Sequence, residues 1–236
     1  MGLADVLVAV TDVLFPDHCL VTGQPLTTTT TSPLPHVSQE ALDALLLAPR
    51  PVELLLTLQR HHAADELFMS TVRALYAVGG TGDCSSIIYA IKYGGRTALA
   101  RSCGQWMAPL IAELPRTPTM LVPVPIHPAR RRERGYNQAE ELAHGIAAVT
   151  GIPVMAAIRR TVHTSSQTTL ADEQRQQNVR SVFALTELPD PSILQGAVCA
   201  LIDDVCTTGA TLNACAEVLL QGGAARVDAL TFGATV

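Results

Sequence analysis

The sequence predicts an α/β protein with a doubly wound parallel sheet, preceded by a mostly helical N-terminal region. The run Val198–Ile202 is apolar without alternation, which is typical of a parallel strand that is buried on both faces, and we expect further strands at Met120–Ile126 and Val227–Phe232. Helical patterns separate these runs, as right-handed crossovers require. A hydrophobic fraction of 48% with 16% charged residues indicates a compact globular chain.

The N-terminal third is expected to be helical. Residues 1–15 predict an amphipathic helix without the basic start of an export signal, so we expect a cytoplasmic protein that does not enter a membrane. Helical patterns return at Ser38–Ala48, with Ser38 as the N-cap, and at Val52–Tyr76. We therefore divide the chain into a helical region, residues 1–75, and a main domain, residues 76–236.

The main domain is expected to begin with two helices that meet at Gly94–Gly95. After the first strand we expect a helix over Asn137–Val149 and a strand over Ile152–Ile158. The polar stretch 161–180 then has few apolar residues, and long polar loops in compact domains often act as active-site lids.

A candidate site follows the apolar run Val198–Ile202. Asp203 and Asp204 mark the carboxyl end of the predicted strand, where open α/β sheets bind ligands. Thr207–Thr211 then lead into a helix, and its first N–H groups and hydroxyls suit a phosphate group. Adjacent carboxylates can hold hydroxyl groups or a hard cation such as Mg²⁺. This combination describes a sugar-phosphate site.

Four arginines, at positions 130, 131, 132 and 134, follow the strand that begins at Met120. The chain has a net charge of −5, so this positive cluster is a local feature. We interpret the segment as a loop that binds a polyanion, because guanidinium groups match phosphate oxygens. Net negative charge and an aromatic content of 4% argue against autonomous binding of nucleic acid.

Four motifs in this order resemble the ComF/GntX-like family of phosphoribosyltransferase homologues, within the type I phosphoribosyltransferase superfamily. They are AIKYGGR at 90–96, VPVPIHPARRRERGYNQ at 122–138, TSSQTTLADEQRQQNV at 164–179 and LIDDVCTTGAT at 201–211. The resemblance extends from about Tyr76 to the end of the chain.

The resemblance implies a site for phosphoribosyl diphosphate (PRPP) with Mg²⁺. Asp203 and Asp204 would contact the ribose hydroxyls and the metal, and would act as the catalytic carboxylates. The 5-phosphate would bind at Thr207, Thr208, Gly209, Ala210 and Thr211. Pyrophosphate would bind at the segment that contains Pro125, His127, Arg130 and Arg134, and the lid would contain Gln167, Arg175 and Asn178.

The family usually has two N-terminal C-x-x-C pairs that bind zinc, and here the first pair reads Cys19-Leu-Val-Thr22 while the second is missing. We therefore expect no zinc.

If the chain is an enzyme, it transfers phosphoribose to an unknown nitrogen acceptor. The alternative is a catalytically silent accessory of DNA uptake that binds single-stranded DNA or a helicase-like partner. The oligomeric state stays open, with a dimer as one option. Cys206, next to the predicted phosphate loop, is interpreted as a tolerated small residue.

Overall fold

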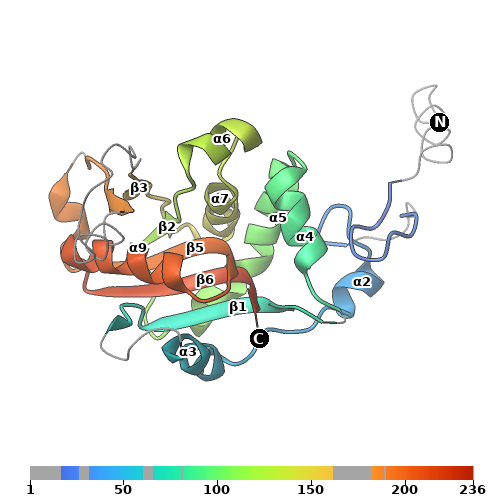
Figure 1. Ribbon diagram of the computed structural model, residues 1–236, viewed down its shortest axis with the longest axis horizontal. Coiled ribbons are helices and arrows are strands. Elements are labelled where there is room, and N and C mark those ends of the chain that lie inside the picture. The colour runs from blue at the N-terminus through green and yellow to red at the C-terminus, as the bar shows by residue number, and fades with distance from the viewer. Residues whose placement is uncertain are drawn as a thin grey trace, which may run out of the picture.

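The computed structural model describes residues 17–26, 32–60, 66–80, 82–161, 182–188 and 190–235. Its centre is a four-stranded sheet in the order β1-β6-β5-β2, and all three strand pairs are parallel (Figure 1). This confirms the predicted α/β class with a parallel sheet. The strands are β1 (Thr71–Val78), β2 (Met120–Pro123), β5 (Val198–Cys206) and β6 (Arg226–Thr235).

Helices cover both faces of this sheet. Strand side chains alternate between the two faces, so Ala200 and Ile202 pack in one core while Cys199 and Leu201 pack in the other. The first core also contains residues of α4 (Ser85–Tyr93), α5 (Thr97–Met107), the 3₁₀ helix η2 (Ala108–Glu113) and α7 (Gln138–Thr150). The second contains residues of α3 (Pro51–Gln59) and α9 (Ala210–Gln221).

Two glycines set the close contact of α5 with α7. A Cβ on Gly104 would collide with the backbone carbonyl of Leu142, and one on Gly145 would collide with the carbonyl of Arg101. The two backbones therefore touch directly, which fixes where α7 begins relative to the sheet. The expected helices on either side of Gly94–Gly95 and the expected helix Asn137–Val149 are confirmed as α4, α5 and α7.

The predicted helix Val52–Tyr76 is wrong in its second half. Helix α3 ends at Gln59, and Thr71–Val78 is strand β1, which pairs in parallel with β6. The physical reason is burial on the sheet: β1 pairs along β6, with Val72 buried in one core and Leu75, on the opposite face of the strand, packed against the other. The boundary that we placed after residue 75 therefore falls inside a strand of the main sheet.

The predicted strand Ile152–Ile158 is also wrong. Within this range a single residue, Val154, forms an isolated parallel bridge, and its partner is Leu121 in β2. β3 (Ile158–Arg160) pairs antiparallel with β4 (Phe183–Leu185), apart from the main sheet. Pro153 lacks an N–H group for a continuous ladder, although its carbonyl accepts a hydrogen bond from the N–H of Leu121.

Residues 17–50 are less helical than predicted within their described parts. Helix α2 covers only Gln39–Asp43, with the hydroxyl of Ser38 as its N-cap. The segment after it pairs with β1, since the N–H of Ala48 donates to the carbonyl of Leu75. Prolines at 25, 33, 35 and 49 interrupt longer helices here.

The predicted helix over residues 1–15 and the predicted lid beyond Thr161 lie outside the described residues, as do Gln167, Arg175 and Asn178. Among the described helices, none combines the length and the apolar character needed to cross a membrane.

Candidate functional site

An open pocket of about 330 Å³ lies beyond the carboxyl ends of β2 and β5. It adjoins a smaller pocket of about 60 Å³ at the start of α9, and the two share Asp203, Thr207 and Thr211. All eleven PRPP-binding residues predicted from the sequence line one or both pockets. The larger pocket is lined by Lys92, Tyr93, Val124, Pro125, Ile126, His127, Arg130, Arg134, Gln138, Arg160, Asp203, Asp204, Val205, Thr207 and Thr211.

The carboxylate pair lies within β5, which extends to Cys206 rather than ending before Asp203. Asp204 is only 2% exposed, and its Oδ1 lies 3.0 Å from the Nζ of Lys92. Its second oxygen, Oδ2, is buried and accepts no hydrogen bond from any described residue. Asp203 is partly buried, and its Oδ1 accepts a hydrogen bond from the N–H of Asp204 at 2.9 Å.

Burial raises the pKa of both carboxyl groups, and the charge of Asp204 raises the pKa of Asp203 further. The positive charge of Lys92 lowers both pKa values but does not cancel the effect of burial. The pair therefore has one ammonium partner and one carboxylate oxygen without a hydrogen bond from a described residue, and a bound cation would favour its charged form. Two carboxylates with a free oxygen fit a hard divalent cation such as Mg²⁺.

The loop from Thr207 to Thr211 meets the start of α9 at the smaller pocket. Gly209 is the N-cap with a φ of +71°, and a Cβ at this position would lie 2.6 Å from Cδ2 of Leu58 in α3. This left-handed conformation and the close contact both require glycine. Thr207, Thr208, Ala210 and Thr211 are exposed around it, so the loop offers hydroxyl groups and the first N–H groups of a helix to an anion.

The arginine cluster is a helix rather than the predicted loop. α6 spans Pro128–Arg134, because Pro128 suits the first helical position and the arginines after it are good helix formers. The Nδ1 atom of His127 accepts a hydrogen bond from the N–H of Ala129 at 3.1 Å, so His127 caps this helix. Within α6, Arg131 makes a bidentate ion pair with Glu140 at 2.7 and 3.0 Å.

Arg134 connects α6 to the other side of the pocket. Its Nη1 donates to Oε1 of Gln138 at 2.9 Å, and its guanidinium carbon lies 4.9 Å from the centre of the Tyr93 ring. Its buried Nε has no hydrogen-bond partner among the described residues. Arg134 is thus held at the pocket with a donor still available.

Lys92, Tyr93, Gln138 and Arg160 are pocket residues that the predicted site did not include. Lys92 and Tyr93 lie at the end of α4, at the joint before Gly94 where two helices were expected to meet. The motifs AIKYGGR and GYNQ contain three of the four and are the signal that could have found them. Arg160 had no recognisable signal, because its place depends on the β3–β4 pairing.

The cysteines differ in the acidity of their thiols. Burial and the charge of Asp203 raise the pKa of Cys206 to about 11, which fits the interpretation of Cys206 as a small structural residue. Burial also acts to raise the pKa of Cys19, but hydrogen bonds from Ser38 and Thr22 lower it to about 6. The backbone N–H and the side-chain hydroxyl of Ser38 donate to the sulfur of Cys19 at 3.4 and 3.6 Å. No group of three or more metal-binding side chains occurs among the described residues.

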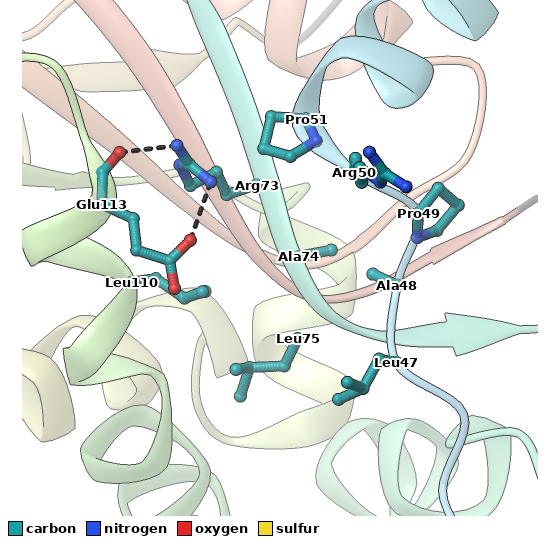
Figure 2. A pocket seen from close by; sticks show the side chains of 10 residues that line it. All are labelled: Leu47, Ala48, Pro49, Arg50, Pro51, Arg73, Ala74, Leu75, Leu110 and Glu113. Atoms are coloured by element: carbon teal, nitrogen blue, oxygen red, sulfur yellow. Dashed lines mark hydrogen bonds and ion pairs between the residues drawn. The ribbon is translucent and has the colours of Figure 1, made fainter.

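A separate pocket of about 230 Å³ lies beside β1 and contains none of the predicted site residues (Figure 2). Arg73 lies at one end of it and donates to the carboxylate and the carbonyl of Glu113 at 2.7 and 2.6 Å. Leu47 and Leu75 line the opposite part, with Arg50 and two prolines along the rim. Its ion pair joins Arg73 to the exposed Glu113, and its lining contains no carboxylate pair and no phosphate loop of the kind found at the site on β5.

Two solved structures overlap part of the fold. A glutamine PRPP amidotransferase from B. subtilis is 17% identical, with 60% of this chain and 30% of that chain covered, at a TM-score of 0.43. A purine phosphoribosyltransferase from Pyrococcus horikoshii is 15% identical, with 57% and 83% covered, at a TM-score of 0.36. Overlap at this level specifies no substrate.

No family model matches the chain, but curated proteins do. Competence protein F of Haemophilus influenzae is 30% identical over 154 residues, which cover 61% of this chain and 65% of that protein. DNA utilization protein YhgH of Escherichia coli is 31% identical over 150 residues, which cover 61% and 64%. Competence protein ComFC of Bacillus subtilis is 32% identical over 116 residues, which cover 48% and 43%. The chain thus spans just under two thirds of the first two relatives, and over that span its sequence is similar to these competence and DNA utilization proteins.

Proposed function

We propose that this protein binds PRPP with Mg²⁺ and transfers phosphoribose to a nitrogen acceptor, with release of pyrophosphate. The observation that carries the proposal is the continuity of two pockets, which joins a buried carboxylate pair to a glycine-containing phosphate loop. A ribose that carries a phosphate at one end and a diphosphate at the other would use both features and the arginines of α6.

Each group of residues would act on a different part of PRPP. Thr207–Thr211 would hold the 5-phosphate through N–H groups and hydroxyls. Asp203 and Asp204 would accept hydrogen bonds from the ribose hydroxyls and hold Mg²⁺, which supplies positive charge to the pyrophosphate when bound. Arg130 and Arg134 would contact the pyrophosphate oxygens.

In the transfer, the bond between C1 and the pyrophosphate oxygen breaks and its electron pair leaves with pyrophosphate. The nitrogen lone pair of the acceptor forms the new bond to C1, and that nitrogen then loses a proton. Positive charge develops on the ribose ring as the first bond breaks. The fixed negative charge of Asp203 and Asp204 beside the ring would stabilise this transition state.

The test is pyrophosphate release from PRPP in the presence of Mg²⁺ and a panel of nitrogen bases. We expect release with at least one base, and a loss of at least about 100-fold in Asp203→Asn, since one transition-state contact contributes about 2.7–4 kcal/mol. Asp43→Asn is the matched control, because Asp43 is an exposed carboxylate on α2 outside the pocket. PRPP binding without release by any base would remove the transferase part of the proposal.

A second candidate function is an accessory role in DNA uptake, as the names of the relatives suggest. In this role the protein would bind single-stranded DNA or a helicase-like partner without transferring phosphoribose. Three exposed arginines on α6 favour contact with nucleic-acid phosphates. Binding of an oligonucleotide that weakens steeply with salt would support this role, and salt-independent binding would contradict it.

A further inference from the structure

Two tyrosines form an exposed pair on α4. Tyr89 and Tyr93 are one helical turn apart, with 66% and 50% of their surfaces exposed. Their ring centres are 4.8 Å apart at an interplanar angle of 41°. Aromatic side chains bury large apolar areas in cores and interfaces, so a pair left in water marks a surface suited to a flat ligand.

The pair is held in place by the elements around it. The hydroxyl of Tyr136, which follows α6, donates to the carbonyl of Ile91 and ties the end of α4 to the segment between α6 and α7. The guanidinium of Arg134 packs over the ring of Tyr93. A ligand that stacks here therefore meets rings that are already ordered, which lowers the entropy lost on binding.

The neighbouring charges favour a phosphodiester chain. Arg130 and Arg132 on α6 are exposed and form no ion pair with another described residue. Arg131 between them is engaged by Glu140 and contributes less. Arg130 lines the same pocket as Tyr93, so its guanidinium group and that ring face one continuous surface, and Arg132 lies on the same short helix outside the pocket.

We propose that the Tyr89–Tyr93 pair is a stacking platform for the unpaired bases of single-stranded nucleic acid, whose phosphates contact Arg130 and Arg132. Every nucleobase presents a flat face, so such a platform accepts many sequences. A duplex hides these faces in its own stack, which favours a single strand as the ligand. The inference rests on the second proposed function for its ligand, and it shares Arg130 with the site proposed for pyrophosphate.

The test measures anisotropy of a fluorescent 15-mer of thymidylate bound to the full chain, next to an abasic 15-mer with the same phosphates. We expect Tyr89→Leu to weaken binding of the thymidylate strand about 5- to 20-fold, within the range for loss of one base–aromatic contact. Tyr89→Phe keeps the ring and should bind within about twofold of the wild type. The abasic strand should bind more weakly than the thymidylate strand and should not respond to Tyr89→Leu.

The contact of Arg130 and Arg132 with phosphates is tested by the salt dependence of oligonucleotide binding. Removing Arg130 and Arg132 together should reduce the slope of log affinity against log salt by about 1.4, at about 0.7 per phosphate contact. Arg116→Ala is the matched control, because Arg116 is an exposed arginine away from the pocket. Equal binding of the abasic and thymidylate strands, or wild-type affinity in Tyr89→Leu, would overturn the platform.

PRPP titration separates this inference from the first proposed function. Tyr89 does not line the pocket, so Tyr89→Leu should retain the wild-type affinity for PRPP and the wild-type melting temperature. A parallel loss of PRPP affinity would show that Tyr89→Leu disturbs the pocket. The weaker binding of the thymidylate strand would then not come from the loss of a stacking platform, and the proposal would be rejected.

Discussion

Replacing Asp203 with Asn should stabilise the ligand-free protein, although Asp203 lies at the centre of the candidate site. Asp203 and Asp204 are adjacent and largely removed from water, and only Asp204 has an ammonium partner. Asn at position 203 removes one negative charge, and its side-chain oxygen can still accept the hydrogen bond from the N–H of Asp204. Lys92 then faces a single carboxylate.

The expected gain follows from the repulsion that is relieved. Two unit charges at about 4 Å repel by about 4 kcal/mol at an effective permittivity of about 20, and by less at a longer distance. The ammonium of Lys92 and the partial solvation of Asp203 reduce this value, so we expect a gain of about 1–2 kcal/mol in the free energy of unfolding. For a chain of this size that corresponds to a rise of about 2–8 °C in melting temperature.

Asp228 is the matched control, because it is also a buried aspartate in the same sheet. It accepts two hydrogen bonds from Arg226 at 2.7 and 2.8 Å. Asp228→Asn would leave that guanidinium without its counter-ion, so we expect a loss of about 2–4 kcal/mol. A gain in the free energy of unfolding in Asp203→Asn and a loss in Asp228→Asn would distinguish the repulsive Asp203–Asp204 pair from the stabilising Arg226–Asp228 pair.

Urea denaturation with a chelator at pH 5 and pH 8 measures both effects. A carboxyl with a raised pKa stabilises the fold below its unfolded pKa, and that contribution is lost as the pH rises through the folded pKa. The advantage of Asp203→Asn should therefore be larger at pH 8 than at pH 5. A variant that is less stable than the wild type at pH 8, or an advantage that shrinks with pH, would refute this reasoning.

Three further predictions concern the phosphate loop, the helix contact and Cys19. Gly209→Ala should destabilise the protein by about 1–3 kcal/mol, because it places a Cβ at positive φ against the α3 side chain; an unchanged urea midpoint would contradict this. Gly104→Ala should lower the melting temperature more than an alanine at an exposed glycine, because it forces α5 away from α7; equal effects would show that the helices can separate without cost. The alkylation rate of Cys19 should be half-maximal near pH 6, and Ser38→Ala should move that midpoint upward by removing the hydroxyl donor; mass spectrometry of labelled peptides measures both, and an unmoved profile would assign the low pKa to other groups.

The parallel sheet was predictable from sequence because its central strands are short and largely apolar. Val198–Ile202 and Val227–Phe232 are buried, and runs of this length are typical of strands rather than helices. Thr71–Val78 was missed because it is an edge strand with mixed burial, and its alternation is obscured by Arg73. Its partner, β6, lies about 155 residues away, so only tertiary pairing identifies it.

The site was predictable where chemistry is concentrated in one segment. Asp203, Asp204 and Thr207–Thr211 lie within nine residues, and a strand followed by a helix brings them together without long-range contacts. Lys92 was not assigned because its role depends on an ion pair with Asp204, 112 positions away in sequence. The helical state of Arg130–Arg134 was missed because α6 is short and mostly charged, so it shows no apolar periodicity of a helix.

Calorimetric titration of the full chain with PRPP, with and without Mg²⁺, tests the central claim most directly. We predict binding that strengthens with Mg²⁺ and is lost in Asp204→Asn, because Asp204 supplies the vacant buried oxygen. Asp43→Asn should bind as the wild type does. Wild-type PRPP affinity in Asp204→Asn, or affinity that is the same with and without Mg²⁺, would contradict the assignment of this carboxylate pair as the PRPP–Mg²⁺ site.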